Sequence, residues 1–124
     1  MFKAIMEGVA FALKDCLNVA LKDGIKVISA SICGSRVRSS FWRQIVSDVF
    51  GIPLKTMVTN QGPSYDSAIL AMVGDRKYAS VEEVCSLLCK VKDVILPDDK
   101  KRVYYDPKHA RFVRLYPALK EYDQ

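Results

Sequence analysis

The chain has 124 residues, of which 50% are hydrophobic and 27% charged, and its formal net charge is +5. A chain of this length and composition can bury one core, so we expect a single domain. Lys or Asp interrupts every apolar stretch well short of a bilayer span, and no cleavage site follows the first residues, so we expect no membrane partner, no signal peptide and a cytoplasmic protein.

The start of the chain predicts one long amphipathic helix. Apolar residues recur there at helical spacing, and Gly24 follows them as a C-terminal stop. The stripe that they form needs a partner, and it consists of Phe2, Ile5, Met6, Val9, Leu13, Cys16, Leu17 and Ala20.

The next segments predict a parallel βαβ unit. Residues 25–32 are rich in β-branched side chains and are bounded by glycines, which is typical of a buried strand. Ser39 or Ser40 then caps a helix that ends at Gly51, and residues 54–58 form a second strand. A helical crossover makes the two strands parallel. On the helix, Trp42 is expected to pack in the core rather than to form a wall of an adenine pocket.

The rest of the chain predicts more helices than strands. Gly62-Pro63 begins a helix that runs to Gly74, with proline at its first position. Ser80 and Glu83 form a capping box for a helix over residues 81–89.

A loop and a last helix follow. Residues 90–102 are rich in Pro, Asp and Lys and predict a loop. Asp106-Pro107 then begins the final helix. The whole pattern favours a helix-rich α/β fold.

Cysteine and histidine positions do not predict a catalytic or metal site. Cys85 and Cys89 lie four residues apart on an apolar helix face, so we expect small core side chains; a zinc site would show tighter paired spacing. His109 lies at a predicted helix start with no candidate nucleophile near it in sequence, which indicates a surface or capping role.

The segment ASICGSRVRSSFWRQ, residues 30–44, predicts an anion site. A strand breaks at Gly34 into a polar loop, and a helix opens behind it. Free backbone N–H groups and the helix dipole point into such a loop, so we expect a phosphate group there. Arg36, Arg38 and Arg43 suit a polyanion such as ATP, whereas most other basic residues are expected to form a solvated face.

A basic charge also suits nucleic acid, which we keep as a further alternative. No recognition motif is present, and the aromatic residues fall on helical core spacings rather than on a stacking platform. We therefore expect no nucleic-acid partner.

The same segment resembles the C-terminal nucleotide-binding segment of the FGGY family of carbohydrate kinases, and xylulose kinases most closely, where a GGGxRSxxWRQ-like pattern stands. Other family-like segments follow in order and with family-like spacing, so the resemblance covers nearly the whole chain. They are EGVAFALKD at 7–15, SDVFGIPL at 47–54, GPSYDSAILA at 62–71, YASVEEVC at 78–85 and LYPALK at 115–120.

The resemblance implies a partial ribonuclease H-like, actin-like ATPase domain with a small parallel βαβ unit. Residues 1–124 are then expected to form a single domain, the C-terminal part of the second, nucleotide-binding domain of a sugar kinase, without the N-terminal sugar-binding domain. Family members enter the first helix from upstream strands, so we expect an excised piece or a truncated reading frame.

The resemblance also implies a reaction. A complete enzyme transfers the γ-phosphate of ATP, with Mg²⁺, to a ketose such as D-xylulose, and a catalytic aspartate accepts the hydroxyl proton. No aspartate here matches that base, so this chain is expected to be inactive alone. Gly34, Ser35 and Arg36 occupy the glycine-triplet loop beside the nucleotide phosphates, and Ser39 occupies the position that faces the nucleoside.

Two departures from the family pattern put nucleotide binding in question. Ser35 and Arg36 replace two glycines, and Arg36 either pairs with phosphate or blocks the pocket. Asp66 stands where a small residue is usual, and it repels phosphates unless it faces solvent. The alternative function is therefore a degenerate, non-catalytic remnant that acts as an interaction or structural domain.

Self-association is the last expectation. The apolar stripe of the first helix and an unpaired sheet edge are surfaces that soluble monomers rarely expose. We expect a homo-oligomer that covers them.

Overall fold

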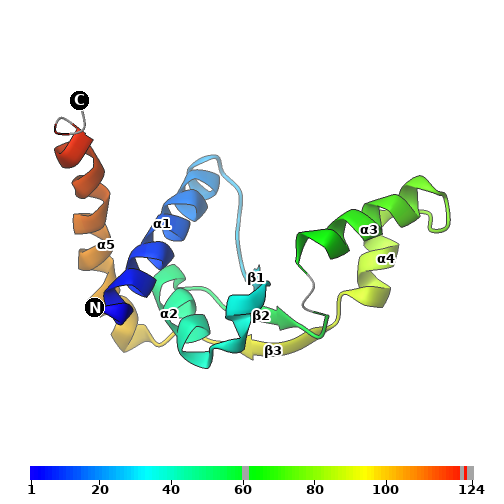
Figure 1. Cartoon of the computed structure of the whole chain (residues 1–124), viewed down its shortest axis with the longest axis horizontal. Helices are drawn as coiled ribbons and strands as arrows, with labels where there is room; N and C mark the ends of the chain where they lie inside the picture. The colour runs from blue at the N-terminus through cyan, green and yellow to red at the C-terminus, as the bar shows by residue number, and fades with distance from the viewer. Residues whose placement is uncertain (60–61, 121, 123–124) are drawn as a thin grey trace.

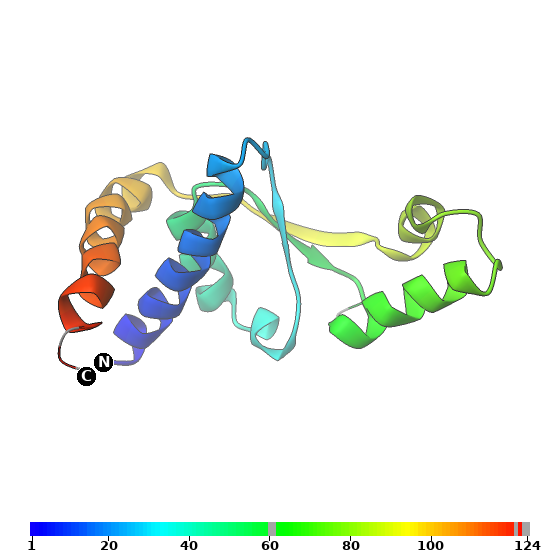
Figure 2. The same cartoon turned by 90° about the horizontal axis from the view of Figure 1, so that it is seen from above.

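The computed structural model describes residues 1–59, 62–120 and 122, and in this part of the chain a small mixed sheet lies between two groups of helices (Figures 1 and 2). The sheet has the order β1 (Ala30–Ile32), β2 (Leu54–Met57), β3 (Val91–Ile95). β1 and β2 are parallel, and β3 is antiparallel to β2.

The helices gather at the two ends of the sheet. α1, α2 and α5 lie together at one end, and α3 and α4 lie at the other (Figure 1). Their bounds are α1 Phe2–Lys22, α2 Ser40–Phe50, α3 Pro63–Gly74, α4 Val81–Leu88 and α5 Asp99–Lys120, and a short 3-10 helix, η1, spans Ser35–Arg38.

The predicted βαβ unit is confirmed, but β1 is shorter than expected. The segment 25–32 was predicted as a strand, whereas only Ala30–Ile32 is one. Ala30 pairs with Leu54, the first residue of β2, and the Ala30 N–H donates to the Pro53 carbonyl at 3.0 Å. Residues 25–29 have no strand partner among the described residues, and Ile28 is 84% exposed.

The prediction of a loop over residues 90–102 is wrong. Residues 91–95 form β3 because their backbone groups complete the ladder of β2, a gain that local composition does not reveal. The last helix begins at Asp99 rather than at Asp106-Pro107, because the Asp98 carboxylate accepts from the Lys100 N–H at 3.0 Å and caps α5.

The predicted ends of α2 and the predicted start of α4 are confirmed. The Ser39 hydroxyl accepts from the Trp42 N–H at 3.2 Å, and Gly51 ends α2 in the left-handed region with φ 70°. The Ser80 hydroxyl likewise accepts from the Glu83 N–H at 3.2 Å. These local signals are readable because each lies within one helical turn of its partner.

The first helix is confirmed, but much of its predicted apolar stripe is exposed, although Met6 packs against the core. Phe2 and Ile5 are 76% and 61% exposed, whereas Ala10 and Phe11 are buried. The difference arises because α2 and α5 pack on the neighbouring face of α1. The buried core there consists of Ala10, Phe11, Trp42, Ile45, Val46, Val49, Leu54 and Tyr105.

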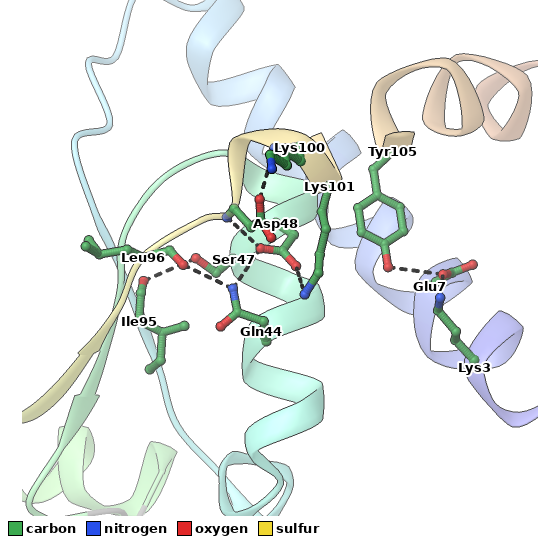
Figure 3. Close-up of polar contacts among 11 residues, drawn as sticks. Lys3, Glu7, Gln44, Ser47, Asp48, Ile95, Leu96, Lys100, Lys101 and Tyr105 are labelled. Carbon is green, nitrogen blue, oxygen red and sulfur yellow. Dashed lines mark hydrogen bonds and ion pairs between the residues drawn. The ribbon is translucent and has the colours of Figure 1, made fainter. Parts of the chain in front are cut away.

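Glu7 is a buried carboxylate on that packed face. Tyr105 of α5 donates its hydroxyl proton to Glu7 Oε1 at 3.1 Å, and Lys3 Nζ lies 3.5 Å from the same oxygen (Figure 3). Burial raises the pKa of the Tyr105 hydroxyl, and the charge of Glu7 raises it further. The tyrosine therefore keeps the proton that joins α5 to α1.

Asp48 joins α2 to the segment between β3 and α5. Its side chain is 1% exposed, and Oδ1 accepts from Gln44 Nε2 at 2.7 Å and from the Asp98 N–H at 2.8 Å. Lys101 Nζ lies 3.5 Å from Oδ2 (Figure 3). Beside it, the Ser47 hydroxyl donates to the Ile95 carbonyl at 3.1 Å. Gln44 therefore belongs to the same network as Asp48.

Replacing Asp48 by alanine is expected to lower the free energy of unfolding by about 3 kcal/mol, because the Asp98 N–H and the Gln44 amide lose their acceptor in a buried place. Urea unfolding of the chain measures the change. Asp75→Ala, an exposed carboxylate after α3, serves as the control and is expected to change stability by less than about 0.5 kcal/mol. Equal stabilities of the two variants would contradict the role of Asp48.

Arg76→Gly is expected to stabilise the end of α3. Arg76 has φ 57°, and its N–H donates to the Val73 carbonyl while the Lys77 N–H reaches Met72, which is a glycine-type helix end. Removing the side chain relieves a left-handed strain of about 1 kcal/mol. Slower hydrogen exchange of the α3 amides measures this stabilisation. The control, Lys77→Gly, is expected to speed exchange. Faster exchange in Arg76→Gly would refute the assignment.

Candidate functional site

The predicted strand, loop and helix around Gly34 are present. β1 ends at Ile32, η1 follows, and Ser39 caps α2. Gly34 has φ 95°, in the region that side chains rarely adopt, although a Cβ there would meet nothing within 4 Å. Glycine is therefore required at this position by the backbone conformation and not by crowding.

Val37 fixes this loop onto the protein. Its side chain is 7% exposed, and its N–H donates to the Gly34 carbonyl at 3.2 Å. The side chains of Ser35 and Arg36 lie outside the described part of the structure, and the two roles predicted for Arg36 stay predictions.

A cavity of about 360 Å³, which we call the strand-end cavity, opens where the parallel strands β1 and β2 end. Ligands of parallel sheets bind at this end of the strands. The chain also brings the start of α3 and the end of α4 to the same place. The side chains around the cavity include Ser31, Cys33, Thr59, Tyr65, Asp66 and Cys89.

The strand-end cavity has an acidic side. Asp66 is exposed in the first turn of α3 and also lines the cavity, so both predicted positions, solvent and pocket, apply. Burial raises the pKa of the Cys89 thiol, and the Cys85 thiol and the Asp66 carboxylate raise it further. A carboxylate opposes a phosphate group there but accepts hydrogen bonds from hydroxyl groups.

Ser39 and Cys33, the residue before Gly34, border different cavities. The Ser39 hydroxyl caps α2, and Ser39 borders an apolar cavity of about 290 Å³ between α1 and α2. Trp42 lines this cavity too, but the indole is 6% exposed and part of the core cluster, as expected. That Ser39 faces a nucleoside stays a prediction.

Arg38 and Arg43, two of the three arginines expected near the anion, border a third cavity together, between η1, α2 and the strands β2 and β3. The Arg43 side chain is 21% exposed, and its Nη1 lies 3.7 Å from Asp93 Oδ2.

Sequence reasoning misplaced Cys89 and His109. Cys89 lines the strand-end cavity instead of the core, because α4 ends at Leu88 and buries only Val84 among its own residues. His109 lies inside α5, 9% exposed, with Nε2 2.7 Å from Asp15 Oδ1. Because α5 begins at Asp99, residue 109 falls in the packed middle of the helix rather than at its start.

Tyr65 and Thr59 were not singled out from the sequence. Thr59 directly follows the predicted strand over residues 54–58, and Tyr65 lies in the first turn of the predicted helix. The rule that ligands bind at the carboxyl ends of parallel strands would have found Thr59.

The described part of the chain has neither a cluster of metal ligands nor a membrane-spanning helix. Over residues 1–59, 62–120 and 122, no three His, Cys, Asp or Glu side chains come together as metal ligands. Within the same residues, no helix is both long and apolar enough to span a membrane.

The chain is similar in sequence to carbohydrate kinases. Residues 1–74 match the model of the C-terminal domain of the FGGY family of carbohydrate kinases. Xylulose kinase of Escherichia coli strain K12 is 33% identical over 94% of this chain and 24% of its own length. Xylulose kinase of Staphylococcus epidermidis is 26% identical over 96% of this chain and 24% of its own length.

Solved structures agree in fold. Ligand-bound xylulose kinase from Lactobacillus acidophilus superposes with a TM-score of 0.82, at 23% identity, over 94% of this chain and 24% of its own chain. Xylulose kinase from Rhodospirillum rubrum superposes with a TM-score of 0.74, at 26% identity, over 96% of this chain and 24% of its own chain. The helix-rich α/β fold is that of the sugar kinases of this family, which is ribonuclease H-like and actin-like, as expected. The chain spans about a quarter of the length of the curated relatives that it matches. It belongs to the FGGY family of carbohydrate kinases.

Proposed function

We propose that the chain is the nucleotide-holding, C-terminal portion of an ATP-dependent carbohydrate kinase that phosphorylates a ketose such as D-xylulose. The observation that carries the proposal is the strand-end cavity, which lies beside the Gly34 loop at the carboxyl ends of two parallel strands. The match to the C-terminal domain of the family supports it. In this proposal residues 1–124 are one domain, and the sugar-binding domain lies in another part of the kinase.

Phosphoryl transfer depends mainly on positioning and charge stabilisation. The backbone of Gly34, Ser35 and Arg36 is the part of this chain that we assign to the phosphates, and Ser39 is assigned to the nucleoside. Mg²⁺ supplies charge neutralisation when it arrives with ATP, since magnesium commonly keeps substrate phosphates and waters as ligands. The sugar site and the catalytic base are assigned to the rest of the kinase, so the chain alone is inactive.

A cytoplasmic location accompanies this proposal. The four cysteines are free thiols, which suits a reducing compartment. Cys85 lies in α4 and Cys89 directly follows it, yet the two form no disulfide.

The alternative proposal is a non-catalytic remnant. The observation that favours it is the Asp66 carboxylate on the strand-end cavity, where it opposes phosphate. In that case the chain acts as an interaction or structural domain.

Calorimetric titration with MgATP and with ADP separates the two proposals. The kinase proposal expects both nucleotides to bind, and Asp66→Asn to bind them about fivefold more tightly because a repulsive charge of about 1 kcal/mol is removed. Asp75→Asn removes the same charge at the other end of α3 and is expected to leave the affinity unchanged.

Arg36→Gly extends the same titration. Binding by this variant alone indicates that Arg36 blocks a usable site, and stronger binding by the unaltered chain indicates that Arg36 pairs with phosphate. Failure of all four proteins to bind either nucleotide refutes the nucleotide-holding role and favours the remnant.

We also propose that the chain self-associates through the exposed face of α1. Phe2 and Ile5 are 76% and 61% exposed and border the apolar cavity between α1 and α2. β1 is an edge strand of the described sheet. A second copy that covers this face removes apolar area from water.

Sedimentation velocity at micromolar concentration is expected to show a dimer or a larger oligomer, and Ile5→Lys is expected to shift it to monomer by placing a charge in the covered surface. Val103→Lys, at an equally exposed apolar residue of α5, is the control and leaves the oligomer intact. A strictly monomeric unaltered chain refutes self-association.

A further inference from the structure

The basic cavity between α2 and β3 has the features of a second anion site, independent of the nucleotide proposal. Its volume is about 450 Å³, and we call it the α2–β3 cavity. Its walls come from η1 and α2, and its floor comes from β2 and β3. Arg38, Arg43 and Lys92 border it, against the single carboxylate of Asp93, so the charge around it is positive.

A bulge in β3 aims Lys92 at this cavity. Thr56 of β2 pairs with Asp93, but the next residue, Met57, pairs with Val91, so Lys92 is the extra residue. Neighbouring residues of a regular strand point to opposite faces of the sheet. The bulge breaks that alternation, and Lys92 and Asp93 consequently border the same cavity.

Thr56 holds the bulged strand in place. Its buried hydroxyl accepts from the Asp93 N–H at 3.1 Å and donates to the Asp93 carbonyl at 3.4 Å. The backbone next to Lys92 is thus held by Thr56 at the floor of the cavity.

Arg43 borders the same cavity and carries a buried donor, its Nε–H, without an acceptor among the described residues. The contact of Nη1 with Asp93 Oδ2, at 3.7 Å, is too long for a hydrogen bond, and that carboxylate is 54% exposed. A buried donor without an acceptor is costly, and a guanidinium matches two oxygens of a phosphate group.

We propose that the α2–β3 cavity binds a small anion that carries phosphate groups. The strand-end cavity is a separate place, because its charged side chain is Asp66 and the two cavities share only Met57 among their lining residues. Arg43 and Lys92 bind the phosphate oxygens, and Asp93 limits the affinity.

Calorimetric titration of the whole chain with sodium pyrophosphate at constant ionic strength tests the proposal. Arg43→Lys keeps the charge but removes the planar fork, and it is expected to weaken binding about tenfold. Lys92→Ala also weakens binding, whereas Lys77→Ala removes the same charge from an exposed site after α3 and leaves it unchanged.

Asp93→Asn is expected to tighten pyrophosphate binding, the opposite of the effect of Arg43→Lys and Lys92→Ala. A variant with a damaged fold would not bind more tightly. Asp66→Asn is expected to leave the affinity unchanged, since its effect belongs to the strand-end cavity. The proposal is overturned if the unaltered chain does not bind pyrophosphate, if Lys77→Ala weakens binding as much as Lys92→Ala, or if Asp66→Asn changes the affinity more than Arg43→Lys does. Titrations of the unaltered chain and of Arg43→Lys with ADP and with ribose 5-phosphate then identify the source of the phosphate group, which is the ligand whose binding Arg43→Lys weakens.

Discussion

The buried carboxylate of Asp48 is the constraint on which the described fold depends. It lies on α2 yet accepts from the Asp98 N–H, directly before α5. A buried charge is stable only when its hydrogen bonds are made, so α2 cannot pack without the β3–α5 junction in place. That junction in turn brings Tyr105 against Glu7 of α1. Three helices distant in sequence are thereby held as one layer beside the sheet (Figures 1 and 3).

The candidate sites follow from this layer. With α2 held, the chain between β1 and α2 has to turn within a few residues, and Gly34 supplies the positive φ for that turn. The turn and the carboxyl ends of β1 and β2 define the strand-end cavity, and α2 and β3 define the basic cavity on Arg43. One βαβ unit therefore separates an acidic hollow, at Asp66, from a basic one.

This division of charge concerns the residues at which the sequence departs from the pattern that it resembles. The resemblance implies glycine or another small residue where this chain has Ser35, Arg36 and Asp66. Asp66 gives the strand-end cavity an acceptor for hydroxyl groups on the side of α3, because a carboxylate accepts but does not donate hydrogen bonds. Arg38 and Arg43 lie on the side of η1 and α2, where the buried Arg43 Nε–H has no acceptor among the described residues. The loop therefore has a carboxylate that accepts hydrogen bonds on one side and arginine donors on the other.

The sequence by itself determined the features that depend on neighbours within a turn or two: the helix caps at Ser39 and Ser80, the left-handed glycines, the long first helix and the parallel βαβ order. The motif around Gly34 also indicated the family, which the comparisons confirmed.

Only the tertiary structure decided which face of α1 is buried, that residues 91–95 pair with β2, and that His109 and Gln44 are partnered. A strand edge, a bulge and a buried carboxylate gain their stability from groups distant in the chain, and no local pattern contains those partners.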